Sequence, residues 1–280
     1  MAEAPPASVA QAIRDAAEKL AKTSDTARLD AEVLMAHALG VSRSQLLVRH
    51  MSEPVPVGFA AMLERRLTRE PVAYITGHRE FCGLDLAVTP DVLIPRGDSE
   101  VLVEAALAAQ PGASRVLDCG TGSGALLLAV LAALPGATGI GIDRSQAALR
   151  IASANAAALG IAGATFLERD WCEPGWAGDL GAFDLVLANP PYVEQGAALD
   201  PDVRDFEPEG ALFAGPDGLD AYRALLPQVP ELLRPGGMAF VEIGAHQGSA
   251  VSTIAAGCGM SAILHRDLAG RPRGLQLQAR

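Results

Sequence analysis

The residues best suited to chemistry form the run Asn189-Pro190-Pro191-Tyr192, called here the NPPY turn. It follows an apolar segment, residues 183–188, that is typical of a buried strand. Two consecutive prolines fix φ, remove two backbone donors and keep Asn189 extended, so the chain must turn rigidly there. In an open α/β sheet, ligands bind beyond the carboxyl ends of the strands. The NPPY turn is therefore predicted to belong to a binding site.

This turn suits alkylation of an amide or an aromatic amine, whose nitrogen is a weak nucleophile because its lone pair is delocalised. The side-chain oxygen of Asn189 and the carbonyl of Pro190 could accept both N–H groups, which would orient the nitrogen and stabilise developing positive charge. Tyr192 offers a flat face against the planar group. The alternative for so short a motif is a proline-stiffened surface turn.

A second candidate site lies upstream in Asp118-Cys119-Gly120-Thr121-Gly122-Ser123-Gly124, called here the glycine turn. It separates a short predicted strand from an apolar segment at 125–134. Glycines let the backbone approach a ligand closely, and a helix that begins there exposes unpaired N–H groups. The spacing is Gly-x-Gly-x-Gly, which is neither the dinucleotide-binding Gly-x-Gly-x-x-Gly nor a phosphate loop. A tight turn without a ligand is the alternative.

Acidic residues accompany the glycine turn. Asp143 ends a predicted strand at 138–143, within the roughly 20–25 residues at which a carboxylate reaches a ribose diol in this class of sheet. Asp118 adds a second negative group. Two acids without a basic phosphate clamp suit a positively charged nucleoside, and S-adenosylmethionine fits. A further predicted strand ends in Asp170-Trp171, where Trp171 could meet the adenine and Asp170 could accept from its amine, although a tryptophan there is equally typical of core packing.

The composition is that of a soluble, cytoplasmic enzyme. Of the 280 residues 50% are hydrophobic, yet the longest apolar run is too short to span a bilayer. The first residues, with Glu3, Pro5 and Pro6, lack the pattern of a signal peptide. The cysteines and histidines show no metal-ligand spacing, so no metal is expected, and His246 is expected to be a solvated loop residue. A net charge of −11 argues against direct nucleic-acid binding.

The chain is expected to contain a helical bundle at residues 1–74, a connecting β-hairpin at 75–95 and a doubly wound, Rossmann-like α/β domain at 96–280. The hairpin is expected to pair residues 81–88 with 92–94. Helices are expected at 98–109, 125–134, 145–159, 218–233 and 248–256, and strands at 116–118, 138–143, 165–168, 185–188 and 237–243, before a C-terminal hairpin that reaches residue 277. The bundle has no catalytic constellation, so it should either pack or dock a macromolecular partner.

The chain resembles the HemK/PrmC family, the glutamine-N5 methyltransferases that modify peptide chain release factors. The resemblance covers most of the chain and rests on the glycine turn, Asp143, Asp170-Trp171 and the NPPY turn in the family's order. Other matching stretches are residues 71–81, 92–96, 203–208, 217–219 and 266–270. The sequence departs from the family at Gly97, Ser99 and Cys119, where a second proline, a threonine and a leucine are usual.

The resemblance implies a class I methyltransferase that uses S-adenosylmethionine and leaves S-adenosylhomocysteine. It maps cofactor contacts onto residues 120–124, Asp143, Trp171 and Asn189, and the pocket for the substrate glutamine onto the NPPY turn. The implied target is the glutamine of the Gly-Gly-Gln motif of release factors, with the helical bundle helping to engage that protein. We expect a monomer without a membrane partner. The alternatives are glutamine methylation of a ribosomal protein, adenine-amine methylation of nucleic acid, and a non-catalytic module that binds S-adenosylmethionine.

Overall fold

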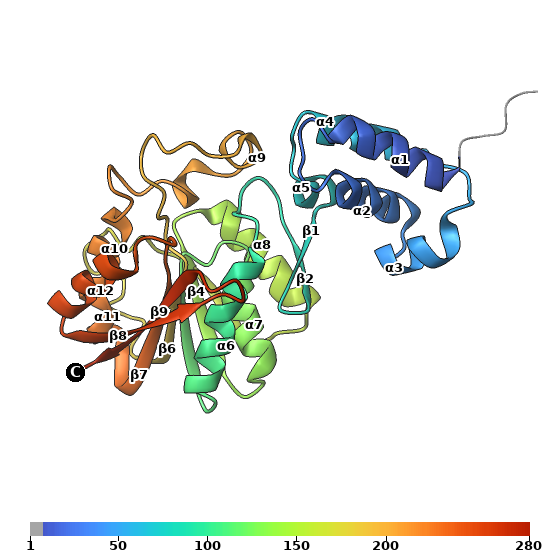
Figure 1. Cartoon of the computed structure of the whole chain (residues 1–280). Helices are drawn as coiled ribbons and strands as arrows, with labels where there is room; N and C mark the ends of the chain where they lie inside the picture. The colour runs from blue at the N-terminus through green and yellow to red at the C-terminus, as the bar shows by residue number, and fades with distance from the viewer. Residues whose placement is uncertain (1–7) are drawn as a thin grey trace, which may run out of the picture. The chain divides into compact units, whose positions relative to one another are not determined.

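A computed structural model describes residues 8–280, which form two compact units (Figure 1). The first unit contains the described residues up to His78 together with Leu199–Phe206. The second contains Arg79–Ala198 and Glu207–Arg280. Residues 1–7, on which the expectation of no signal peptide rests, lie outside the described part of the chain.

The first unit is helical. Helix α1 (Val9–Leu20) is capped at its N-terminus by Ser8, whose hydroxyl accepts from the Gln11 amide. Helix α2 (Ala27–Leu39) is followed by Gly40, whose φ of 67° ends the helix. The remaining helical segments are α3 (Arg43–Gln45), a π-helix (Leu46–His50), α4 (Phe59–Leu67), α5 (Val72–Thr76) and α9 (Pro201–Arg204). Apolar faces of α1 and α2 meet in a core of their own.

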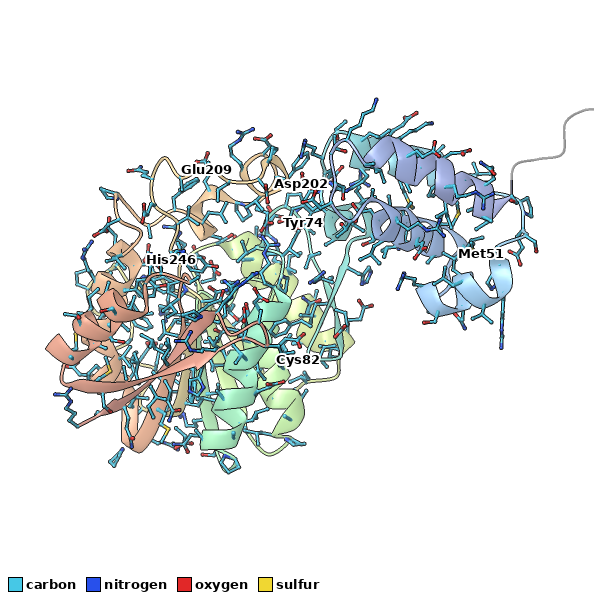
Figure 2. All side chains as sticks on the ribbon, viewed as in Figure 1. Met51, Tyr74, Cys82, Asp202, Glu209 and His246 are labelled. Atoms are coloured by element: carbon cyan, nitrogen blue, oxygen red, sulfur yellow. The ribbon has the colours of Figure 1, made fainter. Side chains whose placement is uncertain are left out.

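A buried arginine holds α9 within this unit. Arg66 is 5% exposed. Its Nε donates to Asp30 (2.8 Å) and its Nη1 to Asp202 (2.7 Å; labelled in Figure 2). Asp30 also accepts from the hydroxyls of Ser24 and Thr26, both at 2.8 Å. Because a buried charge is costly unless it is paired and hydrogen-bonded, this group specifies where α9 attaches.

The β-hairpin differs from the expected pairing. Strands β1 (His78–Phe81) and β2 (Leu84–Ala87) form a two-stranded sheet joined by Cys82-Gly83. Cys82 and Gly83 have φ angles of 48° and 74°, as the central residues of a type I′ turn require. The predicted pairing of 81–88 with 92–94 is therefore wrong, because the two-residue turn closes the hairpin earlier and residues 92–94 form no strand.

The second unit is built on a sheet which, within the described residues, has seven strands in the order β5-β4-β3-β6-β7-β9-β8. The strands are β3 (Arg115–Cys119), β4 (Thr138–Asp143), β5 (Ala164–Glu168), β6 (Phe183–Ala188), β7 (Leu233–Glu242), β8 (Met260–Arg266) and β9 (Pro272–Ala279). The first five pair with one another in parallel, and β9 pairs antiparallel with both β7 and β8. This arrangement confirms the expected doubly wound class.

Helices cover both faces of this sheet. They are α6 (Glu100–Ala109), α7 (Ala125–Ala133), α8 (Gln146–Ala158), α10 (Asp220–Leu225), α11 (Val229–Leu232) and α12 (Gly248–Gly257). Along β6, Leu185 and Leu187 pack into the core with α6 and α7, whereas Val186 and Ala188 pack into the core with α10, α11 and α12. Alternate strand residues thus face opposite layers, as the period of a strand requires. Figure 1 shows α6, α7 and α8 gathered beside the sheet.

Two expected elements are corrected. The single helix expected at 218–233 is instead α10, a 3₁₀ turn (Leu226–Gln228) and α11, because Pro227 and Pro230 cannot continue the helical hydrogen bonds. Strand β7 begins at Leu233 rather than 237, and the sequence Pro235-Gly236-Gly237 lies inside it at an irregularity in the pairing with β6.

The pairing register brings three expected site segments together. Cys119, the last residue of β3, is the partner of Ile142 on β4 and of Ala188 on β6. The residues that follow these partners are Gly120, Asp143 and Asn189. The glycine turn, the acid and the NPPY turn therefore leave the sheet side by side at its carboxyl edge, with β3 in the middle.

Candidate active site

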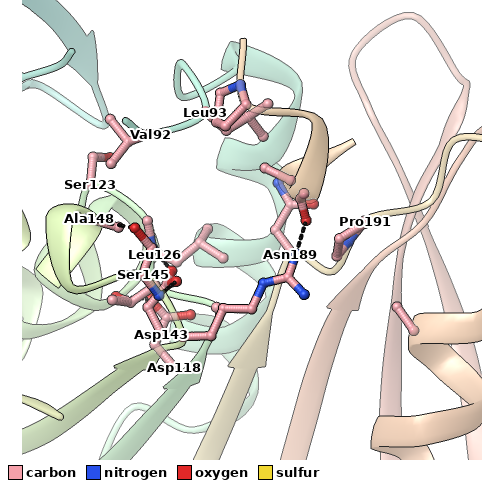
Figure 3. Close-up of a pocket in the computed structure, with 18 of the residues that line it drawn as sticks. Val92, Leu93, Asp118, Ser123, Leu126, Asp143, Ser145, Ala148, Asn189 and Pro191 are labelled. Atoms are coloured by element: carbon pink, nitrogen blue, oxygen red, sulfur yellow. Dashed lines mark hydrogen bonds between the residues drawn. The ribbon is translucent and has the colours of Figure 1, made fainter. Parts of the chain in front are cut away.

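A cavity of about 590 Å³ opens at this edge of the second unit (Figure 3). Its volume lies within the range of sites for small ligands. Predicted residues that line it are Asp118, Gly120, Thr121, Gly122, Ser123, Asp143, Asp170, Trp171, Asn189 and Pro191. The predicted residues Gly124, Pro190 and Tyr192 are not among the lining residues. One cavity thus joins the glycine turn to the NPPY turn.

The glycine turn needs its glycines for conformation and for space. Gly120, Gly122 and Gly124 have φ angles of 75°, 55° and 85°, which side chains with a Cβ rarely adopt. A Cβ on Gly120 would also lie 2.9 Å from the ring of Trp171. Gly124 precedes the first residue of α7, so its conformation starts the helix rather than lining the cavity. The turn is tight, and Trp171 packs directly against its backbone.

Asp118 places an unpartnered acceptor at the base of the cavity. The residue is 1% exposed, and its Oδ2 accepts from the Thr121 hydroxyl at 2.7 Å. Its Oδ1 is buried without a hydrogen-bond partner among the described residues. Burial raises the pKa of Asp118 to about 7. A buried carboxyl with a free acceptor fits a cationic ligand, because the sulfonium and ammonium groups of S-adenosylmethionine would supply the missing charge.

Asp143 lies beside Asp118 in Figure 3 and is bound to the glycine turn. Its Oδ2 accepts from the amide of Gly122 (3.0 Å) and its Oδ1 from the amide of Ser145 (2.9 Å). Burial raises the pKa of Asp143, and these two amide hydrogen bonds oppose that rise. Each carboxylate oxygen keeps acceptor capacity for a hydroxyl, so this side chain can receive a ribose diol.

Asp170 and Trp171 close the neighbouring wall. The Oδ1 of Asp170 accepts from the amide of Cys172 at 2.9 Å. Trp171 is half-buried, lines the cavity, and lies so close to Gly120 that a Cβ there would meet its ring. A flat ring beside a glycine turn can stack on a planar base.

The NPPY turn presents Asn189 and Pro191 to the cavity (Figure 3). Pro190 is buried beneath them. The hydroxyl of Tyr192 is 3.4 Å from Oε1 of Glu242, a carboxylate 2% exposed at the end of β7. Burial raises the pKa of Tyr192 to about 12, so the phenol stays protonated and donates. The turn is therefore held from behind while its asparagine faces the cavity.

Further lining residues were not assigned a site role from the sequence. They include Val92 and Leu93, Arg144, whose Nη2 donates to the carbonyl of Gly210 at 3.1 Å, and Phe213. Close by, the buried Glu207 pairs with Arg96 and accepts from the amide of Ile94. The sequence offered a signal for Val92, Leu93, Arg96 and Glu207, because residues 92–96 and 203–208 are among the stretches that carry the family resemblance.

Across residues 8–280, no group of three histidine, cysteine or acidic side chains could hold a metal ion. No helix in the same part of the chain is long and apolar enough to cross a membrane. His246 (labelled in Figure 2) is exposed and does not line the cavity.

Each of the two units contains a stretch that matches a known protein family. Residues 11–77 match the PrmC N-terminal domain, and residues 112–258 match a methyltransferase domain. A release factor glutamine methyltransferase of Cereibacter sphaeroides is 44% identical over 94% of this chain and 96% of its own. One of Rhodospirillum rubrum is 44% identical over 90% of this chain and 79% of its own.

A solved ribosomal protein L11 methylase from Lactobacillus delbrueckii subsp. bulgaricus is similar in fold alone. Its TM-score is 0.51 at 22% identity, over 69% of this chain and 84% of that chain. The full-length matches are the ones that decide the family. The fold is that of the methyltransferases that use S-adenosylmethionine, and the chain belongs to the release factor glutamine methyltransferases.

Proposed function

We propose that this enzyme transfers the methyl group of S-adenosylmethionine to the side-chain amide nitrogen of the glutamine in the Gly-Gly-Gln motif of peptide chain release factors. The observation that carries the proposal is the juxtaposition in one cavity of the NPPY turn with the paired acids Asp118 and Asp143. An amide-gripping turn and a cation-binding wall are the two parts that such a transfer needs.

In the proposed site, S-adenosylmethionine supplies an electrophilic methyl group. Asp118 receives the positive end of the cofactor, Asp143 the ribose hydroxyls, and Trp171 with Asp170 the adenine. The glycine turn, with Thr121 and Ser123, supplies backbone close to the cofactor. These assignments are supported by the lining of the cavity, by the free Oδ1 of Asp118 and by the contact of Trp171 with Gly120.

The NPPY turn acts on the substrate amide. Asn189 Oδ1, on the cavity wall, accepts one of its N–H groups, and the carbonyl of Pro190, a residue that does not itself line the cavity, accepts the other. Pro191 keeps the turn rigid, and Tyr192 supports it from behind. Accepting both N–H groups directs the nitrogen lone pair toward the methyl group and stabilises positive charge on the nitrogen. Positioning alone can supply on the order of 7–11 kcal/mol of the barrier in favourable cases. The methylated amide is then a strong acid and loses its proton without a dedicated base.

We further propose that the helical unit engages the release factor, and that the enzyme works as a monomer in the cytoplasm without binding nucleic acid. The net charge of −11 disfavours attraction to a phosphate backbone.

The test is to incubate the enzyme with S-adenosylmethionine and purified release factor and to locate the added methylene by peptide mass spectrometry. We expect it on the glutamine of Gly-Gly-Gln, and none on a release factor in which that glutamine is replaced by glutamate. Parallel reactions with ribosomal proteins and with DNA test the alternative substrates. Methylation of either in preference to release factor would overturn the proposal.

A further inference from the structure

Two glutamines outside the cavity each hold the backbone of an aromatic residue of the site. Nε2 of Gln247 donates to the carbonyl of Tyr192 at 2.9 Å, and Nε2 of Gln228 donates to the carbonyl of Trp171 at 2.9 Å. Neither glutamine is among the described residues that line the cavity. Any effect on the reaction must therefore pass through the residues they hold.

The carboxamide of Gln247 makes three hydrogen bonds to the backbone. Besides Tyr192, its Nε2 donates to the carbonyl of Gly218 at 3.1 Å. Its Oε1 accepts from the amide of Gly244 at 3.1 Å. An amide has two donors and two acceptor lone pairs, and both donors and one lone pair are engaged. One side chain thus joins the NPPY turn, the loop at Gly218 and the end of β7.

The backbone around Gln247 leaves no spare space. A Cβ on Gly218 would lie 2.4 Å from the Tyr192 carbonyl oxygen and 2.7 Å from Nε2 of Gln247. A Cβ on Gly244 would lie 2.8 Å from Oε1 of Gln247. These contacts are shorter than side chains tolerate, so glycine at both positions lets the carboxamide reach all three segments. A side chain at either glycine would displace the carboxamide, and one at Gly218 would also displace the Tyr192 carbonyl.

Gln228 holds the backbone of Trp171, which lines the cavity on the side proposed to bind the cofactor. Its Nε2 donates to the carbonyls of Trp171 (2.9 Å) and Ala224 (2.8 Å). Its Oε1 accepts from Nε1 of Trp176 at 2.5 Å, and Trp176 is 5% exposed in the core. Trp171 is thereby anchored to a buried side chain and to the end of α10.

We propose that Gln247 and Gln228 are positioning residues for separate halves of the site, Gln247 for the amide-gripping NPPY turn and Gln228 for Trp171 beside the cofactor. The inference rests on the proposed function, because the two halves are defined by the substrate amide and by S-adenosylmethionine. It predicts separable defects, one in turnover and one in cofactor affinity.

Gln247→Met and Gln228→Met test this, because methionine keeps the length of the side chain and removes its hydrogen bonds. Since a misplacement of about 1 Å can cost roughly 100-fold in rate, we expect Gln247→Met to lower kcat by about 10–100-fold and to change the Kd of S-adenosylhomocysteine by less than about threefold. Gln228→Met should raise that Kd roughly 10-fold, which corresponds to the loss of about one hydrogen bond. Its kcat at saturating cofactor should stay within about threefold of the wild type. Calorimetry gives the Kd and initial rates on release factor give kcat.

A second readout does not need catalysis. Hydrogen exchange of the cofactor-free protein should speed up in peptides covering residues 189–197 for Gln247→Met but not for Gln228→Met. The amide of Val193, bonded to the carbonyl of Leu212 at 2.8 Å, lies in that segment. Gln247→Glu keeps the acceptor for Gly244 and replaces the methionine variant if that one does not fold. His246→Ala, at the exposed neighbour of Gln247, is the matched control and should change none of these quantities.

Unchanged kcat and exchange in Gln247→Met would overturn the role of Gln247, and an unchanged Kd in Gln228→Met would overturn that of Gln228. Equal losses of kcat and affinity in both variants would indicate a common structural role and would also overturn the proposal. If the wild type transfers no methyl group to release factor, the proposed function fails, while exchange and calorimetry still decide whether the glutamines position the two walls.

Discussion

Replacing Asp118 by asparagine should make the cofactor-free protein at least as stable as the wild type at high pH, and a poorer binder of S-adenosylmethionine. The carboxyl is buried, and its Oδ1 has no partner among the described residues. Its pKa of about 7 in the folded protein compares with an ordinary value of 3.8. The Thr121 hydrogen bond offsets only part of the desolvation cost of the ionised carboxylate, a bound cation would offset more of it, and asparagine removes that cost.

The sign and size of the effect follow from proton linkage. Because the folded pKa is raised, the stability contributed by the protonated carboxyl is fully present below about pH 4 and is lost as the pH rises toward 7. Between pH 5 and pH 8 the wild type should lose up to about 3 kcal/mol of stability relative to Asp118→Asn. The variant leaves a buried amide donor unpaired, which costs about 1–3 kcal/mol at every pH. We expect it to be the less stable protein at pH 5 and to equal or exceed the wild type at pH 8.

Urea unfolding followed by tryptophan fluorescence measures this difference. Trp171 and Trp176 are the protein's only tryptophans, and both lie in the second unit, so the signal reports the unit that contains Asp118. Calorimetry on the same samples gives the affinity for S-adenosylmethionine. Loss of a charged hydrogen-bond acceptor should weaken the variant's binding by about 10–100-fold at pH 8.

The wild type should also bind S-adenosylmethionine about tenfold more weakly at pH 6 than at pH 8, because only roughly a tenth of a carboxyl with a pKa near 7 is ionised at pH 6. Asp143 faces Asp118 and also has a raised pKa, so Asp143→Asn is the matched control, in which the pH dependence should persist. A stability difference between wild type and Asp118→Asn that is the same at pH 5 and pH 8 would refute the reasoning. So would an unaltered pH dependence of binding in Asp118→Asn.

Four other substitutions test the remaining parts. Asn189→Ala should lower turnover by about 10²–10³-fold in a folded protein, because one acceptor of the developing charge is lost. Asp143→Ala should weaken cofactor affinity by at least about tenfold, the loss of one charged hydrogen bond, as calorimetry can measure. Gly120→Ala should weaken cofactor affinity because its Cβ would meet the ring of Trp171 at 2.9 Å. Arg66→Met should destabilise the helical unit by about 3–5 kcal/mol, measured by far-UV circular dichroism, because the buried carboxylate of Asp30 loses its counter-ion.

The controls for these variants come from the same chain. Near-normal turnover in Asn189→Ala, or an unchanged Kd in Asp143→Ala, would remove the proposed role of that residue. Gly236→Ala shares the positive φ of Gly120 but meets no atom within 4 Å, so it should alter stability without altering cofactor affinity. Arg65→Met breaks an exposed pair with Glu70 and should cost no more than about 1 kcal/mol. Equal losses in Arg65→Met and Arg66→Met would contradict the account of the buried group.

Local chemistry made much of this protein predictable. Two prolines after Asn189 force a rigid turn wherever the chain goes, and the glycines at 120, 122 and 124 take the positive φ angles that the tight turn needs. Strand β4 was predicted with the bounds that the structure gives it, and the order of strands and helices indicated a doubly wound sheet. Each of these depends on the conformational limits of a few consecutive residues.

The rest depended on contacts between distant segments. The hairpin was misplaced because the left-handed conformation of Cys82, in the turn with Gly83, is not evident from its residue type. The pairing of Cys119 with both Ile142 and Ala188 decided that the acid and the two turns meet. The free oxygen of Asp118 and the carboxamides of Gln228 and Gln247 have meaning only through their surroundings, because burial and hydrogen-bond partners are properties of the folded chain. Sequence alone thus indicated which segments form the proposed methyl-transfer site, and tertiary packing decided how they are held together.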